Sequence, residues 1–259
     1  MRKRELAAAL LEKKAREKAA RALTVTVERK GTMRTPSRPG MRVVSYAPAE
    51  WMAAIADGNE GRVKRMVELG QDIHIRDKEG WNALHIAVQH GRDVIVRLLL
   101  TQGSHINARD RYGNTALMWA CKYHLTAIAK MLLRAGASMT RQNKLGQTAL
   151  MLAAASKDID VVHAIISTCF RKLLQVQDAE GMTALHHACL SGANECCQKL
   201  VHNGSLVNLR TVSGHTPLML ACRRGHTDIV DLLLSSGADA TVCVRKVCQR
   251  WRGGQGCVV

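Results

Sequence analysis

The chain has 259 residues, of which 47% are hydrophobic and only 3% aromatic, and it carries a formal net charge of +17. No apolar run approaches the roughly 18 residues that a membrane-spanning helix needs, and no secretory hydrophobic region follows the basic start, which argues against membrane and secreted proteins. The nine cysteines are therefore expected to be reduced thiols in a cytoplasmic and/or nuclear protein rather than a disulfide framework.

The positive charge lies mainly at the two ends of the chain. Residues 1–46 contain 13 Lys and Arg against 4 Glu, a balance of +9, and residues 244–259 contain 4 Lys and Arg and no acid, a balance of +4. The middle therefore carries only the remaining +4. Basic ends of this kind keep open one rival function, which is binding to nucleic acid or to an anionic surface through the termini.

The first 43 residues are predicted to be a basic, partly helical extension and linker. Strong helix formers fill residues 5–23, but the possible apolar stripe there is mostly alanine, so a solvated helix is favoured. Two prolines and no apolar periodicity make residues 31–40 typical of a linker. The basic clusters at residues 2–4 and 13–14 leave a localisation signal open as an alternative.

One eight-residue motif, Gly-x-x-Ala/Pro-Leu-x-x-Ala, occurs five times in the chain. Its copies begin at Gly80, Gly113, Gly146, Gly181 and Gly214, at steps of 33, 33, 35 and 33 residues. A repeated unit of this length indicates one supersecondary module stacked on copies of itself, with each unit burying surface only against its neighbours. A single elongated domain therefore accounts for the middle of the chain.

Both the period and the Thr-Ala/Pro-Leu-His-x-Ala pattern within the motif resemble the ankyrin repeat. The resemblance covers residues 44–243 and implies an all-α solenoid of about six helix-turn-helix repeats joined by β-hairpin-like loops. The expected repeats are residues 44–76, 77–109, 110–142, 143–177, 178–210 and 211–243. Residues 244–259 follow as an irregular basic tail, which either folds over the last repeat or marks a shortened form of a longer protein.

Within each repeat the first helix is expected to begin near the threonine of the motif, because threonine caps helix N-termini well. The second helices are expected to begin near Asp93, Thr126, Asp158, Asn194 and Thr227. Glycines at 103, 136, 204 and 237 are expected to end four of these second helices in the left-handed conformation. The first repeat lacks the motif but keeps glycines in register at 58 and 70, which is typical of an N-terminal cap.

Two departures from the pattern predict local irregularity. At the turn between the two helices, where other repeats have glycine, the third and fourth repeats have His124 and Lys157, so we expect a strained or rebuilt turn there. The fourth repeat also lacks the glycine that ends its second helix and contains two additional residues. A bent stack or a longer second helix is expected at that point.

The cluster His186, His187, Cys189, Cys196 and Cys197 has residue types that bind zinc, but the repeat register favours a structural role. The three cysteines align with small or apolar residues of the other copies, where a free cysteine serves as a small apolar side chain. The two histidines lie inside the motif, and catalytic nucleophile, phosphate-loop and metalloprotease motifs are absent. We therefore expect no metal, no cofactor and no catalytic residue.

One histidine position of the motif carries a specific expectation. His85 and His186 stand where the other three copies have methionine. In ankyrin repeats this histidine supports the loop through hydrogen bonds, so the resemblance implies that methionine fills the space without making them.

The candidate binding residues lie at the loop tips and at the first helices, where the resemblance places a partner surface. The set consists of Trp81, Arg111, Tyr112, Asn114, Lys122, Tyr123, Lys144 and Gln147. It combines aromatic and basic side chains, which dominate interface energies and favour an acidic peptide or an acidic protein face. Trp119 aligns with aliphatic residues of the other copies and is expected to be packed inside.

These patterns predict a noncatalytic protein-interaction scaffold or adaptor. Nucleic-acid binding through the basic termini is a weaker alternative, and aromatic residues for base stacking are absent from residues 1–45. A second alternative is the targeting arm of a larger enzyme or ubiquitin-ligase adaptor whose effector module is missing.

Overall fold

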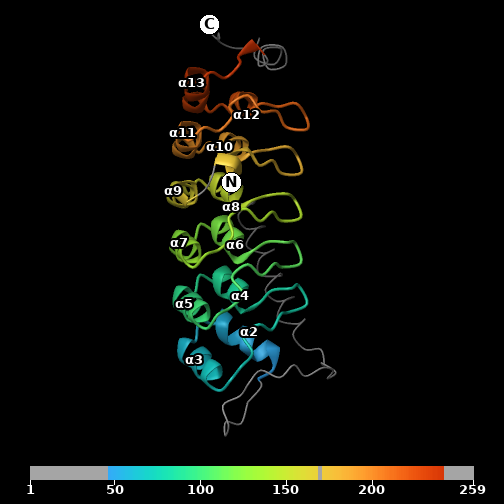
Figure 1. Cartoon of the computed structure of the whole chain (residues 1–259), viewed down its shortest axis with the longest axis vertical. Coiled ribbons are helices and arrows are strands. Elements are labelled where there is room, and N and C mark those ends of the chain that lie inside the picture. Colours follow the sequence, from blue (N-terminus) through green and yellow to red (C-terminus); the bar gives the residue numbers. More distant parts are fainter. Residues whose placement is uncertain (1–45, 169–170, 242–259) are drawn as a thin grey trace, which may run out of the picture.

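The computed structural model describes residues 46–168 and 171–241 as a stack of helix pairs (Figure 1). The predicted extension at residues 1–43 and the predicted tail at residues 244–259 lie outside the described residues. The first helices of the pairs are α2 (Pro48–Ala56), α4 (Ala83–Gln89), α6 (Ala116–Lys122), α8 (Ala149–Ala155), α10 (Ala184–Ser191) and α12 (Pro217–Arg224). The second helices are α3 (Glu60–Glu68), α5 (Asp93–Thr101), α7 (Thr126–Arg134), α9 (Ile159–Thr168), α11 (Asn194–His202) and α13 (Thr227–Ser235).

The helix pairs form two parallel columns, with the loops between repeats projecting from one side (Figure 1). The first helices occupy the middle of the molecule, the second helices form the outer column, and the loops project beyond the first helices. The described residues contain twelve α-helices and no strand, so the predicted all-α solenoid of about six repeats is confirmed.

The motif threonines explain where the first helices begin. Thr115, Thr148 and Thr216 stand at the N-cap with extended backbone, and each side-chain oxygen accepts the backbone N–H three residues later, at 3.3–3.4 Å. Asn82 does the same in the second repeat, at 3.0 Å. Such caps are worth about 1 kcal/mol each, because they satisfy donors that the helix itself leaves unpaired.

The turn between paired helices has a left-handed residue in every repeat. Gly192 and Gly225 adopt it with φ of 78° and 74°, at no steric cost to glycine. His124 and Lys157 adopt the same conformation with φ of 57° and 62°. The prediction of a strained turn in the third and fourth repeats is therefore confirmed, since a side chain at such φ costs roughly 1–2 kcal/mol.

The core consists of thin layers of leucine, isoleucine, valine, alanine, methionine and cysteine. The motif leucines Leu84, Leu117, Leu150, Leu185 and Leu218 are at most 2% exposed. Trp51 stands in the same register of the first repeat and is fully buried, so it fills this position at the start of the stack. Truncating one of these leucines to alanine would cost about 2–5 kcal/mol.

The loops between repeats are hairpin-like in their hydrogen bonding. In each loop one backbone N–H donates to the carbonyl four residues later, as in Asp110 to Asn114 at 2.9 Å and Asp178 to Met182 at 2.9 Å. Neighbouring loops are joined as well, because the N–H of Lys144 donates to the carbonyl of Tyr112 at 2.9 Å. Within the described residues this pattern produces a single isolated antiparallel bridge, between Arg76 and Asn82.

The fourth repeat departs from its neighbours in its second helix. Helix α9 has 10 residues, one more than each of the other second helices. The 3-10 helix η1 (Arg171–Gln175) follows, and it buries Leu173 and Leu174 against the core. The expected irregularity is therefore a longer second helix.

None of the helices in the described part of the chain is both long enough and apolar enough to cross a membrane.

Candidate binding surface

The candidate surface is formed by the loop tips and by the exposed side of the first helices of the second and third repeats. Its centre is an aromatic cluster made of Trp81, Trp119 and Tyr123. The Trp119 ring centroid lies 5.1 Å from that of Trp81 and 5.4 Å from that of Tyr123. Trp81 comes from the loop before α4, whereas Trp119 lies on α6 and Tyr123 at its C-cap, so two repeats build one cluster.

A cation belongs to this cluster. The Lys122 ammonium lies 4.9 Å from the Trp119 ring centroid, within the range of a cation–π contact. This contact positions the lysine charge beside the aromatic rings at the C-terminal end of α6. The surface therefore offers aromatic faces and one positive charge together.

Asp110 ties the loop tip of the third repeat to the aromatic cluster. Its buried carboxylate accepts the backbone N–H groups of Tyr112 and Asn114, both at 2.8 Å. Its second oxygen accepts the indole N–H of Trp119 at 2.9 Å. A carboxylate with several donors is well satisfied after burial, so tip and helix are held as one rigid unit.

The tip itself carries Arg111 and Tyr112. The Nη1 atom of Arg111 donates to both carboxylate oxygens of Glu79 on the preceding tip, at 2.9 and 2.8 Å. The Arg111 guanidinium lies 5.8 Å from the Tyr112 ring centroid. The Glu79 carboxylate raises the pKa of Arg111 by hydrogen bonding. Tyr112 remains 54% exposed, so its ring can meet a partner.

Two predicted site residues, Asn114 and Gln147, make hydrogen bonds mainly to other residues of the loops. Asn114 donates to Asp110 at 3.3 Å and accepts from Asn143 at 2.9 Å. Gln147 also accepts from Asn143, at 3.3 Å. Lys144 is exposed at the next tip. Asn114 and Gln147 therefore support the loops, and a partner would meet their half-buried edges.

The structure brings the predicted residues into two groups. Trp81, Lys122 and Tyr123 meet around Trp119, whereas Arg111 and Tyr112 meet at the tip. Trp119 is only 9% exposed, as its register predicts, but sequence reasoning missed that it is the residue on which the others stack. The signal was the single aromatic residue at a position that is aliphatic or histidine in the other copies.

A ladder of long polar side chains also escaped sequence reasoning. Arg76, Arg109, Gln142 and Gln177 stand in one register, and each donates to the backbone carbonyl of the equivalent residue in the next repeat, at 2.9–3.2 Å. These bonds fix the distance between neighbouring loops. The sequence signal was a long side-chain donor recurring at this one position.

The histidines of the motif hold the starts of the first helices. In His186, Nδ1 accepts the backbone N–H of Thr183 at 3.1 Å, and Nε2 lies 3.1 Å from the carbonyl of Leu209, to which it donates. Burial lowers the pKa of His186 to about 4, so the ring stays neutral. Met151 corrects the expectation for methionine, because its sulfur accepts the N–H of Thr148 at 3.4 Å. It supplies no donor to the next repeat.

The cysteines and the second histidine of this region are packed into the core. Cys189 and Cys197 are fully buried with sulfur atoms 3.8 Å apart, and that contact together with burial raises the pKa of Cys189. His187 Nε2 lies 2.8 Å from Asp178 Oδ2, which repeats the link between Trp119 and Asp110. Across residues 46–168 and 171–241, no three histidine, cysteine or acidic side chains are placed to hold a metal ion.

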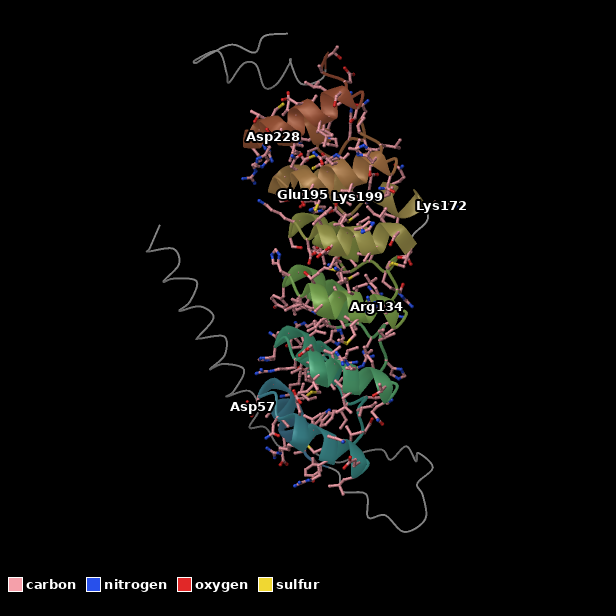
Figure 2. The ribbon with its side chains drawn as sticks, turned by 90° about the vertical axis from the view of Figure 1, so that its left-hand side faces the viewer. Asp57, Arg134, Lys172, Glu195, Lys199 and Asp228 are labelled. Carbon is pink, nitrogen blue, oxygen red and sulfur yellow. The ribbon has the colours of Figure 1, made fainter. Side chains whose placement is uncertain are left out.

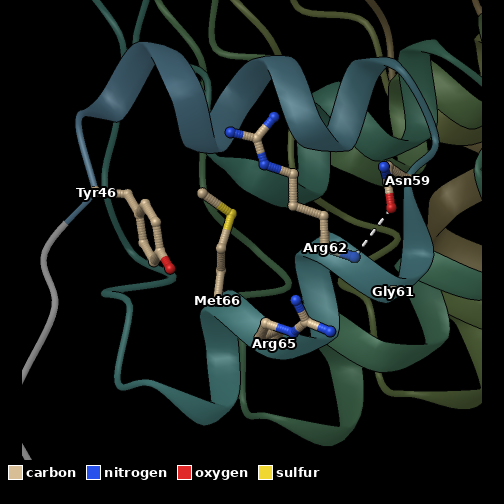
Figure 3. A pocket seen from close by; sticks show the side chains of 6 residues that line it. All are labelled: Tyr46, Asn59, Gly61, Arg62, Arg65 and Met66. Carbon is tan, nitrogen blue, oxygen red and sulfur yellow. Dashed lines mark hydrogen bonds between the residues drawn. The ribbon is translucent and has the colours of Figure 1, made fainter.

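A separate cleft of about 490 Å³ lies at the first repeat (Figure 3). It is lined by Tyr46, Asn59, Gly61, Arg62, Arg65 and Met66. The Arg62 guanidinium is paired with Glu50, and the Asn59 side chain accepts the backbone N–H of Arg62 in the first turn of α3, at 3.0 Å. The polar groups of Asn59 and Arg62 are thus used to build the end of the stack.

The comparisons with known proteins agree with this architecture. The family described as "Ankyrin repeats (3 copies)" matches residues 51–143, 128–211 and 150–243. An ankyrin repeat domain from Acinetobacter baumannii AYE superimposes with a TM-score of 0.67 at 27% identity, covering 73% of this chain and 98% of that one. The ankyrin repeat domain of Bcl-3, a member of the IkappaB protein family, gives a TM-score of 0.65 at 29% identity, covering 74% and 87%.

Among curated proteins, human protein phosphatase 1 regulatory subunit 27 is 40% identical over 82 residues, which is 32% of this chain and 53% of that protein. The chain spans about half or less of the length of the first curated relatives that it matches.

Proposed function

The chain belongs to the ankyrin-repeat family, and on that premise we propose that it is a noncatalytic interaction scaffold or adaptor that binds a protein partner through its loop tips and first helices. Ankyrin repeats are in general a protein-interaction module, which supports this class of function. The aromatic cluster with Lys122 carries the proposal, because it gathers side chains of the types that dominate interface energies.

Rigidity supports this role. The carboxylate of Asp110 and the Arg/Gln ladder fix the tips before a partner arrives. A surface that is already ordered loses little conformational entropy on binding, so more of the contact energy appears as affinity.

Burial argues against catalysis by the motif histidines and by Cys196. His85 and His186 are buried in helix caps, and burial lowers the pKa of both. Burial also raises the pKa of Cys196 to about 12, which keeps its thiol protonated and unreactive. A noncatalytic role therefore fits His85, His186 and Cys196.

The proposal is tested by affinity capture with the full chain and two matched variants. Tyr112→Ala with Tyr123→Ala removes rings that are 54% and 40% exposed on the surface. Val94→Ala with Leu234→Ala removes side chains that are 45% and 42% exposed on the second helices. Trp81 is left intact because its ring is half-buried between His85 and Trp119, so that its loss would weaken the fold more than the loss of the exposed Tyr123 ring.

Quantitative mass spectrometry of the captured proteins gives the result. We expect a set of partners that is lost from the tyrosine variant and kept by the control variant. With one purified partner, the two tyrosines together should cost about 2 kcal/mol of binding energy, or roughly thirtyfold in affinity. Equal retention by both variants would remove this surface as the binding site.

A further inference from the structure

The exposed side of the first helices carries a charge pattern that points to one kind of partner. Four register positions line it in every repeat from the second to the sixth, and in the second repeat they are Trp81, Ile86, Gln89 and His90. The last three lie on one helical face because their spacing is i, i+3 and i+4. The contact of Trp81 with Trp119 shows that these positions adjoin across the second and third repeats.

None of the 20 residues at these positions is acidic. They include three permanent positive charges, at Lys122, Arg223 and Arg224, and all three side chains are exposed. At the neighbouring tips, the Glu79 carboxylate is paired with Arg111, and Glu180 is exposed. The face is therefore basic at the third and sixth repeats.

The second helices differ, because they present both signs of charge on the opposite side of the molecule. Figure 2 shows this outer face, which carries the following labelled side chains: Asp57, Arg134, Lys172, Glu195, Lys199 and Asp228. Of these, Glu195 and Asp228 are the acidic side chains that lie on second helices, α11 and α13. A partner attracted by positive charge alone would be directed to the first helices.

The middle of the face carries no permanent charge. In the fourth and fifth repeats the eight register positions hold the apolar residues Leu152, Ala155, Met182 and Leu190 and the polar residues Gln147, Ser156, His187 and Ser191. Between the basic ends there is thus a stretch where a charged partner residue would lose water without gaining a counter-charge. Uncharged partner side chains fit this stretch better.

The length of the face sets the length of the partner segment. Packed helices lie about 8–10 Å apart, so the three steps from the third to the sixth repeat span roughly 24–30 Å. An extended chain rises about 3.3 Å per residue, which corresponds to roughly eight or nine residues.

We propose that the first-helix face binds an extended segment of a partner protein that is acidic at both ends and uncharged in the middle. One acidic end pairs with Lys122 beside the aromatic cluster, and the other pairs with Arg223 and Arg224. This inference rests on the proposed function, since it names the partner chemistry of the same surface.

Selection of a phage-displayed library of random dodecapeptides on the full chain tests the inference. The first variant combines Lys122→Glu, Arg223→Glu and Arg224→Glu. Its matched control reverses three exposed second-helix charges, through Lys64→Glu, Arg97→Glu and Arg134→Glu. Circular dichroism of each variant establishes that the helices are retained.

The expected peptides carry Asp or Glu on both sides of an uncharged block, with the acids separated by about the length derived above. They should lose at least tenfold in affinity on the first variant and less than twofold on the control, and binding should weaken with salt. Enriched peptides without acids, or equal binding to both charge variants, would overturn the inference.

A third chain, the variant Tyr112→Ala with Tyr123→Ala, separates the two proposals. Neutral or basic peptides that are lost on this variant would leave the proposed surface standing and refute only the acidic partner. Peptides unaffected by both the tyrosine and the first-face charge changes, or a library without any enriched sequence, would count against both.

Discussion

Replacing Gly181 by alanine should destabilise the protein much more than the same change at Gly214. Both glycines begin a copy of the motif and both have φ of +76°, so the backbone cost of an alanine is shared. That cost is roughly 1–2 kcal/mol, and the lower entropy of the unfolded alanine chain returns about 0.4–1 kcal/mol of it. Comparing the two variants therefore separates the backbone strain within a loop from the contact between neighbouring loops.

The difference comes from the neighbouring repeat. A Cβ at residue 181 would lie 2.7 Å from the backbone nitrogen of Val212 and 3.1 Å from the Cα of Thr211. Among the described residues, the same atom at residue 214 would meet nothing within 4 Å. Because backbone atoms cannot rotate away, the crowded site should lose about 1–3 kcal/mol more than the open one.

Urea and thermal unfolding of the full chain, followed by far-UV circular dichroism, give the comparison. For a folded region of this size each kcal/mol shifts Tm by about 2–4 °C, so the two variants should differ by roughly 2–12 °C. Equal losses of stability would refute the account in which close contact between successive loops holds the stack together.

Three further changes probe individual contacts. Stability should fall on acidification from pH 6.5 toward pH 4, because burial lowers the pKa of His186 to about 4 and only the unfolded chain is readily protonated in this range. The stability that comes from the neutral His186 is fully present above pH 6.5, and about 2 kcal/mol of it is lost at pH 5. His186→Met should flatten this part of the pH profile, and an unchanged slope in urea titrations would contradict the assignment. Trp119→Phe should cost about 1–3 kcal/mol in chemical denaturation, since the buried Asp110 side chain loses its indole donor; a neutral result would show that this bond is dispensable. Lys157→Gly should raise the free energy of unfolding by about 0.5–1 kcal/mol, because glycine tolerates φ of 62°, whereas a loss of stability would mean that the lysine side chain makes a contact that outweighs the strain.

Much of the fold could be predicted from the sequence because the same pattern recurs in successive repeats. A helix start at Thr148 is a weak inference by itself, but the same residue type at Thr115 and Thr216 makes it firm. The strained turns at His124 and Lys157 were visible for the same reason, since glycine in the other copies reveals the conformation that these residues must adopt.

The candidate site was less predictable, because some of its contacts, such as Trp81 with Trp119 and Asn114 with Asn143, join neighbouring repeats and all of them depend on side-chain direction. Register alone placed Trp119 inside, and it could not show that the rings of Trp81 and Tyr123 both pack against it. It also could not show that the side-chain oxygens of Asn114 and Gln147 accept hydrogen bonds from the side chain of Asn143.

Footprinting of the full chain by hydroxyl radicals, with and without a captured partner, tests the central claim most directly. The surface predicts that Tyr112 and Tyr123 become protected while Val94 and Leu234 on the second helices stay as reactive as in the free protein. Protection confined to the second helices, or to residues 1–45, would contradict binding through the loop tips and first helices.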